Sequence, residues 1–169
     1  MAISKKPIIG LNTVLKNLHK EVKGIQGRTM AGLIKAVIVV RRDMISNSGT
    51  PPIVPVDEGN LRASFFTVTS TGAVKAGSSP TFKGKQAAKL SAQHGPVVEE
   101  AAGMTKGISN KYKPMVTFGF TAEYAAWVHE NMEATNWQRP GSGPKFMEAS
   151  IKRNHAKIIG EIREAAKVR

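Results

Sequence analysis

The chain has 169 residues, of which 25 are lysine or arginine and 12 are aspartate or glutamate, so its formal net charge is +13. Hydrophobic residues make up 41% and charged residues 22%, a composition typical of one globular domain rather than a disordered chain. No run approaches the roughly 18 apolar residues of a membrane span, and the lack of cysteine excludes disulfides and thiolate metal ligands. The charge indicates an acidic partner. It does not identify nucleic acid as that partner, because the basic residues are spread along the chain and few residues are aromatic.

Residues 12–48 are predicted to form a long N-terminal helix, because apolar residues recur there at three- and four-residue steps. Gly24 and Gly27 predict a bend or a break in that helix. The run Val37–Val40 could also form a strand, but the apolar spacing continues in phase on both sides and favours the helix. Four consecutive apolar residues cover more than one helical face, so the second face needs another surface, such as a neighbouring subunit.

The segment Pro55–Ser64, PVDEGNLRAS, is predicted to be a structural corner between this helix and a strand. Asp57 and Glu58 are adjacent, so on an extended segment they point to opposite sides and do not form an acid/base pair. We expect Asp57 to make local turn hydrogen bonds and to pair with Arg62, and Gly59 to adopt a backbone angle that other residues resist. Arg62 could instead bind an anion, although one arginine is a weak signal for such a site.

Two strands are predicted on either side of a long insertion. The stretch 61–71, LRASFFTVTST, contains the aromatic and β-branched residues of the first strand. Met115–Thr121, MVTFGFT, predicts the second strand, in which Gly119 marks a bulge or a close backbone approach. Residues 72–113 between them are rich in Gly, Ser, Lys and Ala, and only AAKLSAQHGPVVEEA has helical character. We interpret 72–113 as a flexible or arm-like insertion.

The C-terminal third predicts two further helices. A short helix is expected over TAEYAAWVHEN, capped by Thr121. Pro144 is expected in the first turn of a C-terminal helix, where its missing N–H costs nothing. The short helix is expected to pack against the sheet and the C-terminal helix through Tyr124, Trp127 and Val128. Residues 1–169 therefore predict a single α+β domain with a long N-terminal helix, a small antiparallel β-sheet with a long insertion, a short helix and a C-terminal helix.

The motif search indicates no enzyme. His129-Glu130 resembles the start of a zinc-protease motif, but the residue four after His129 is Glu133 rather than histidine. The stretch Gly141–Lys145, GSGPK, is too short for a phosphate-binding loop, and neither a nucleophile elbow nor a dinucleotide fingerprint is present. We assign no catalytic, metal-binding or cofactor-binding residue, no cofactor and no small-molecule substrate.

Three segments in this order resemble the tail-component family of tailed bacteriophages, the small neck and tail-completion proteins that join head to tail. They are PVDEGNLRAS, VTFGFTAEYAAWVHEN and GPKFMEASI. The positions that carry the resemblance in the corner are Asp57, Gly59, Leu61, Arg62 and Ser64, preceded by Pro55 and Val56. In the second segment they are Gly119, Phe120, Tyr124, Ala125, Val128, His129 and Glu130, and in the third they are Gly143, Pro144 and Phe146.

The resemblance implies a non-enzymatic virion protein, made in the host bacterial cytoplasm, that forms a ring of six subunits or a multiple of six. Such a ring stacks between the head connector and the tail tube, so the implied partners are copies of itself and the adjoining head-connector and tail proteins. Genomic DNA passing through the ring is a further candidate partner. The second and third segments are then expected to form core or interface, and no membrane is expected to be involved.

The charge supports one alternative, a basic nucleic-acid-binding module whose affinity falls steeply with salt. We favour protein neighbours, because a lysine-bearing insertion poor in apolar residues would gain order by docking onto an acidic partner. The lysines of this predicted partner-contacting arm are Lys75, Lys83, Lys85, Lys89, Lys106, Lys111 and Lys113.

Overall fold

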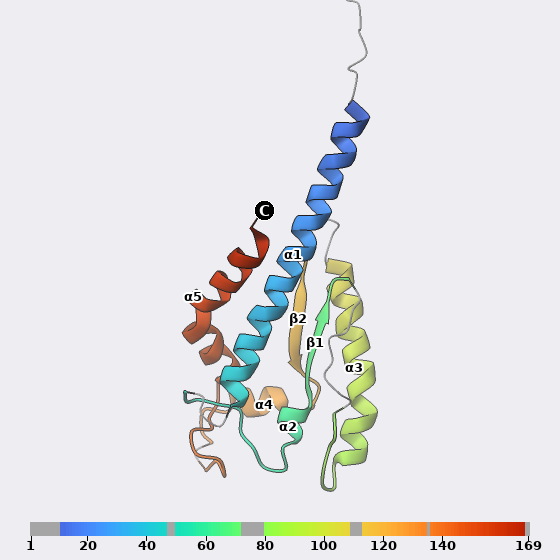
Figure 1. Ribbon diagram of the computed structural model, residues 1–169. Coiled ribbons are helices and arrows are strands. Elements are labelled where there is room, and N and C mark those ends of the chain that lie inside the picture. The colour runs from blue at the N-terminus through green and yellow to red at the C-terminus, as the bar shows by residue number, and fades with distance from the viewer. Residues whose placement is uncertain (1–10, 47–49, 72–79, 109–112, 135, 168–169) are drawn as a thin grey trace, which may run out of the picture.

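The computed structural model describes residues 11–46, 50–71, 80–108, 113–134 and 136–167 (Figure 1). In chain order its elements are α1 (Leu11–Ile45), α2 (Asn60–Ala63), β1 (Phe65–Thr69), α3 (Ala87–Ile108), β2 (Val116–Phe120), α4 (Ala125–Glu130) and α5 (Phe146–Ala166). The predicted fold class is confirmed: an α+β fold with a long N-terminal helix, a small antiparallel sheet with a long insertion, and helices after it.

The first helix, α1, runs without interruption for 35 residues. The break expected near Gly24 and Gly27 is therefore wrong, and the run Val37–Val40 is helical. Packing outweighs the roughly 1 kcal/mol that each glycine costs, because one face of α1 is anchored in the core. Its fully or nearly fully buried apolar residues are Met30, Ala36, Val37, Val40 and Met44.

The sheet consists of two antiparallel strands, β1 and β2, in an unbroken register from Phe65–Phe120 to Thr69–Val116. The ring of Phe65 lies on the α1 side of the sheet, 5.5 Å from the ring of Phe120. Phe66 lies on the opposite face, in a cluster with Val98 of α3. Gly119 sits opposite Phe66 in the register, and the Phe66 ring lies 3.3 Å from where a Cβ would be. The close approach expected at Gly119 therefore comes from a ring, and there is no bulge.

The α3 helix covers the sheet face opposite α1 (Figure 1). Leu90, Val98 and Thr105 are buried, and the Thr105 hydroxyl donates to Oγ1 of Thr117 on β2 at 2.7 Å. The expectation of an arm is therefore wrong for residues 87–108. The sequence between the strands is poor in apolar residues, which predicts a segment without a stable fold of its own. It forms a layer because only one stripe of a helix has to be apolar to cover a sheet.

The start of α4 also differs from the prediction. The helix begins after Tyr124 rather than at Thr121, and no side chain caps it. The Thr121 hydroxyl instead makes a hydrogen bond with Nδ1 of His94 on α3, at 2.8 Å. Thr121 thus ties α3 to the end of the sheet, which is a long-range contact that a helix-capping pattern does not reveal.

The C-terminal helix begins at Phe146, so Pro144 precedes it rather than lying in its first turn. Lys145 occupies the N-terminal boundary in the left-handed conformation, with φ of 56°. Its backbone N–H donates to the carbonyl oxygen of His129 at 2.7 Å. This bond aims α5 back along α1 and buries Phe146 completely.

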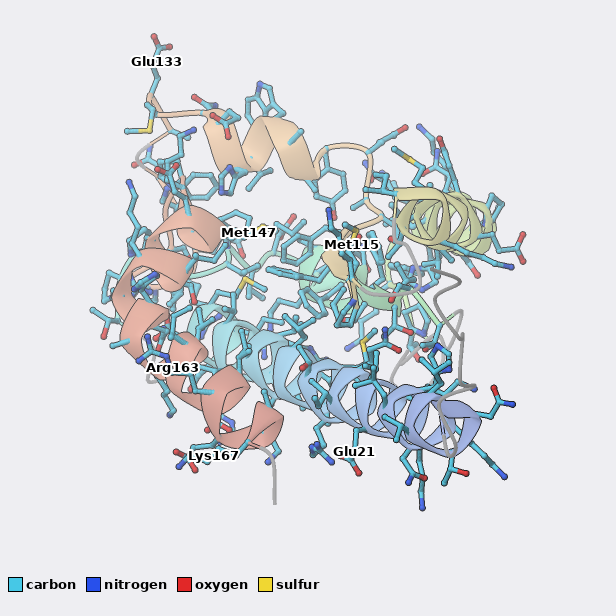
Figure 2. The ribbon with its side chains drawn as sticks, turned by 90° about the horizontal axis from the view of Figure 1, so that it is seen from above. Glu21, Met115, Glu133, Met147, Arg163 and Lys167 are labelled. Atoms are coloured by element: carbon cyan, nitrogen blue, oxygen red, sulfur yellow. The ribbon has the colours of Figure 1, made fainter. Side chains whose placement is uncertain are left out.

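The α5 helix packs antiparallel to α1, and Figure 2 shows the two helices beside each other, away from α3. The Ser150 hydroxyl donates to the Val40 carbonyl oxygen at 3.1 Å, and Arg153 pairs with Asp43 at 2.7 Å. The closest approach is at Gly32. A Cβ there would lie 2.9 Å from Cα of Ile162 and 3.0 Å from Cβ of Ala165.

Replacing Gly32 by alanine is expected to lower the free energy of unfolding by about 1–3 kcal/mol, because the new methyl group would push the α5 backbone away. Gly27→Ala is the matched control, since nothing lies within 4 Å of a Cβ at Gly27. That variant should gain up to about 1 kcal/mol from helix propensity alone. Denaturant unfolding of both variants measures the difference. Equal stabilities would contradict the close packing of α1 on α5.

Candidate interaction surfaces

The segment 55–64 is a corner that turns the chain into β1. Gly59 has φ of 87°, in the left-handed region that favours glycine, and the single turn of α2 follows it. Leu61 and Ser64 are buried. The Ser64 hydroxyl donates to the Leu61 carbonyl oxygen at 2.8 Å, and the Ser64 carbonyl oxygen accepts from the Thr121 N–H at 2.9 Å. The expected backbone role of Gly59 is confirmed.

The expected pairing of Asp57 with Arg62 is wrong within the described residues. The exposed Asp57 carboxylate accepts a hydrogen bond from Nε2 of Gln138 at 3.0 Å. Arg62 lies on the other side of the corner, beside Arg41 and Arg42 of α1. The helical turn of α2 separates the two side chains, because it rotates the chain between positions 57 and 62. No pattern in the sequence predicted that turn.

Asn60 holds the corner instead, and sequence reasoning missed it. Its side chain is nearly fully buried, and Nδ2 donates to the carbonyl oxygen of Lys83 at 2.9 Å. The backbone N–H of Lys83 donates back to Oδ1 of Asn60 at 2.8 Å. Nδ2 also donates to Oε2 of Glu58 at 3.0 Å. The amide thus fixes the start of the insertion to the corner, much as a neighbouring strand would.

A cavity of about 630 Å³ opens between the corner, α4 and residues 136–138. Its lining carries three carboxylates, Asp57, Glu58 and Glu123, with the rings of Tyr124 and Trp137. Burial, and then the charges of Asp57 and Glu58, raise the pKa of Tyr124. The three carboxylates of this acidic cavity contrast with the formal net charge of +13 of the chain.

A second cavity, of about 420 Å³, lies between α1 and α2. We call it the arginine cavity, and its lining residues are Ile38, Arg41, Arg42, Ile45, Ser46 and Arg62. The guanidinium of Arg41 lies 5.3 Å from the centre of the Phe65 ring, which holds it in place. No carboxylate is among these lining residues, so the cavity presents uncompensated positive charge.

Arg139 lies beside the arginine cavity, near Ile45 and Arg62, and has a structural role. Its guanidinium donates to the carbonyl oxygens of Val54, Ile45 and Ser46 at 3.4, 3.3 and 2.5 Å. Burial lowers the pKa of Arg139, and the nearby charge of Arg62 lowers it further. The bonds to three carbonyl oxygens join the end of α1 to the chain that leads into the corner.

The aromatic residues of α4 are divided between core and surface. Val128 is buried and Tyr124 is half-buried, as expected for the inner side of the helix. Trp127 is 64% exposed, so its expected packing against the sheet and α5 is wrong for the single subunit. Ala125 and Val128 form the buried side of α4, and Trp127 follows Ala125 by two residues, about 200° around the helix, so it lies on the outer side.

The second and third family-like segments meet at His129. Its ring packs edge-on against the ring of Phe146 at 4.8 Å, and Nδ1 lies 2.7 Å from Oε1 of Glu130. Glu130 in turn binds Lys145. Gly143 is buried, and a Cβ there would lie 3.2 Å from Cβ of Pro52. His129 is therefore packed against Phe146 and hydrogen-bonded through Nδ1.

The lysines of the insertion are less free than expected. Lys89 pairs with Glu123 across to the loop before α4, and the backbone of Lys83 is held by Asn60. Lys85 lines the acidic cavity. Lys106 and Lys113 are exposed, and Lys75 and Lys111 lie outside the described residues.

Apolar side chains remain exposed along the N-terminal half of α1, which extends beyond the sheet, α3 and α5 (Figure 1). The exposed fractions are 63% for Val14, 43% for Leu15 and 57% for Leu18. Leu18, Ile25 and Gly32 are spaced by seven residues and so share one face of the helix. The helical face that packs on α5 at Gly32 therefore continues through the half-buried Ile25 to the exposed Leu18.

Within the described parts of the chain, no group of three or more histidine or acidic side chains could hold a metal ion. No helix in those parts is both long and apolar enough to cross a bilayer. No protein-family model, curated protein or solved structure matches the chain.

Asn60→Ala is expected to lower the free energy of unfolding by about 1–3 kcal/mol, because it removes a buried amide bonded to both backbone groups of Lys83. Asp57→Ala, which removes an exposed bond to Gln138, should change it by less than about 0.5 kcal/mol. Urea unfolding of the two variants decides which residue braces the corner. A larger loss for Asp57→Ala would reverse this assignment.

His94 makes stability depend on pH. Burial lowers the pKa of His94 below its ordinary value of 6.5. As the pH falls below that value the unfolded chain binds a proton more readily than the folded one, so stability is lost. The free energy of unfolding should therefore be lower at about pH 5.5 than at about pH 7.5, and His94→Gln should reduce this difference.

His155→Gln, on the exposed surface of α5, is the control for that experiment and should keep the wild-type pH dependence. Glu123, Glu130 and Glu148 do not interfere, because hydrogen bonds from lysines lower their pKa values below the ordinary 4.5. Their contribution is lost only in more acidic solution. A His94→Gln variant with an unchanged pH dependence would contradict the role of His94.

Proposed function

We propose that this chain is a structural virion protein of a tailed bacteriophage, a neck or tail-completion subunit that forms a ring and joins the head connector to the tail. The ring would contain six subunits or a multiple of six. Its partners would be copies of the same chain, the head-connector and tail proteins on either side, and DNA passing through its centre. In this role the chain is not an enzyme.

The observation that carries the proposal is the uncovered apolar face of α1. Val14 and Leu18 expose more than half of their side chains on a helix that extends beyond its own domain. Burying an exposed leucine or valine gains about 1.5–3 kcal/mol, so several copies of such a face favour association. A helix that leaves its subunit in this way suits contact with the next subunit or ring.

The arrangement of the three family-like segments supports the same proposal. The corner bonds to the second segment from Ser64 to Thr121, and the second bonds to the third from His129 to Lys145. The first and second segments lie far apart in the sequence, since about sixty residues separate Ser64 from Thr121. All three segments nevertheless form one continuous end of the molecule. Contact between the three segments that carry the resemblance supports a common structural role for them.

The charge fits a subunit that lies between acidic neighbours. A ring of six would carry 6 × 13 = 78 excess positive charges and would repel itself without an acidic counterpart. Acidic surfaces of the adjoining rings, or phosphates of DNA in the central channel, would provide it. The arginine cavity also favours a second candidate function, a nucleic-acid-binding module.

The double substitution Val14→Gln with Leu18→Gln is expected to prevent ring formation by the purified chain. Both side chains are exposed in the single subunit, so the free energy of unfolding should change by less than about 0.5 kcal/mol. Lys16→Gln with Lys20→Gln changes the opposite, exposed face of the same helix and should leave rings intact. Electron micrographs and sedimentation velocity report the assembly state.

A wild-type chain that stays monomeric at every concentration, and binds duplex DNA with a steep salt dependence, would contradict the ring and favour the nucleic-acid module. Rings formed equally well by the Val14 and Leu18 variant would leave the ring in place but remove α1 as its contact.

A further inference from the structure

All twelve acidic residues of this chain lie in the described residues, but only some of them form ion pairs. Asp43, Glu123, Glu130, Glu148 and Glu164 each bind a lysine or arginine of the same chain. Glu99 and Glu100 form no ion pair with another described residue, and both are exposed on α3. Asp57 and Glu58 also form no ion pair with a described residue, but they line the acidic cavity, whereas Glu99 and Glu100 are adjacent acids on an outer helical face.

These two carboxylates lie on an outward face of α3 that also carries apolar and small residues. Met104, four residues after Glu100, is 60% exposed, and Gly103 is open, with nothing within 4 Å of a Cβ. Positions 99, 100, 103 and 104 share one helical face. The open glycine allows another helix to approach closely, within the 8–10 Å that separates packed helix axes.

The arginine cavity has the complementary pattern on α1. Ile38, Arg41, Arg42 and Ile45 recur at positions i, i+3, i+4 and i+7 of one helical face, and Arg62 of α2 lies beside them. Ile38 is 49% exposed. Neither Arg42 nor Arg62 forms an ion pair with another described residue, and Arg62 adds to the positive charge around Arg139.

We propose that the arginine cavity of one subunit binds the Glu99–Glu100 face of α3 of the next subunit, with Ile38 against Met104. This inference rests on the proposed ring and names a second subunit contact in it, besides the apolar face of α1 at Val14 and Leu18. Arg42 and Arg62 bind the two carboxylates, for which the planar guanidinium is well suited. The exposed isoleucine favours a protein occupant over DNA, because a phosphate backbone has nothing to place against an apolar side chain.

The contact joins two different surfaces, so it is heterologous. A heterologous contact repeats from subunit to subunit and closes into a ring when the rotation allows. The two surfaces lie on elements that cover opposite faces of the same sheet, α1 and α3 (Figure 1). Each subunit can therefore use both surfaces at once. The contact also places the unpaired acids against unpaired arginines, which reduces the repulsion between highly basic subunits.

Charge exchange between two variants tests this contact in the full chain. The first variant carries Arg42→Glu and Arg62→Glu, and the second carries Glu99→Lys and Glu100→Lys. Alone, each variant presents like charges at every contact, and its self-association should weaken at least about 100-fold. An equal mixture should regain rings in which the two variants alternate, because both kinds of contact then pair opposite charges.

Matched controls make the same charge changes on exposed residues elsewhere. Lys157→Glu with Arg163→Glu on α5, and Glu133→Lys with Glu164→Lys, should both form rings alone (Figure 2 shows Glu133 and Arg163 at the outside of the molecule). Rings from the wild type and from both test variants would overturn the contact and leave the ring itself in place. A monomeric wild type would overturn both.

A cross-linking measurement does not depend on the charge variants and uses the absence of cysteine in the chain. The double variant Ile38→Cys with Met104→Cys should give a ladder of disulfide-linked oligomers on oxidation, while each single variant should give at most a trace of dimer. Efficient dimers from a single variant would indicate a two-fold contact and overturn the proposal. Loss of duplex binding in the Arg42 and Arg62 variant, with rings unchanged, would assign the cavity to DNA instead.

Discussion

A two-stranded sheet cannot stand alone in water, and the rest of this structure follows from that constraint. Both faces of the β1–β2 pair carry large apolar side chains, with Phe65, Phe118 and Phe120 on one face and Phe66 and Val68 on the other. Each face needs a cover of its own. The long α1 helix covers one, and α3 covers the second. The insertion is therefore part of the core, whatever else it contacts.

The cover on the α1 side is itself completed by α5, and the fit between the two helices depends on small groups. Gly32 brings the backbones together, and Ser150 bonds to a main-chain carbonyl oxygen of α1. Because these side chains are small, the two helices pack closely, and α5 is held along the C-terminal half of α1. In the N-terminal half of α1 the apolar side chains of Val14, Leu15 and Leu18 remain exposed. An exposed apolar face of this kind is typical of an interaction site, which supports the proposed association.

The charges follow a similar division between inside and outside the subunit. Five carboxylates form ion pairs with basic groups of the same chain, and these ion pairs stabilise loops and helix ends. The arginines near the corner are arranged differently. Arg139 donates hydrogen bonds to backbone carbonyl oxygens, whereas Arg42 and Arg62 line a cavity that has no carboxylate among its lining residues. Such a surface costs repulsion in the isolated subunit, since Arg62 already disfavours the charged form of Arg139. An acidic occupant would relieve that repulsion.

The sequence by itself determined α1, α4, α5, the two strands and the position of the corner, because apolar spacing and glycine conformation are local properties. It located β2 nearly to the residue and identified Gly59 as a backbone requirement. Tertiary structure decided the rest. Asp57 and Arg62 separate because a turn of helix between them rotates one away from the other, and Asn60 becomes the brace because Lys83 arrives from 23 residues away. Trp127 is exposed because α4 touches the body along one edge. Residues 87–108 form a layer because a sheet face lay open for them, and which surfaces lie open depends on the whole packed chain rather than on any segment of it.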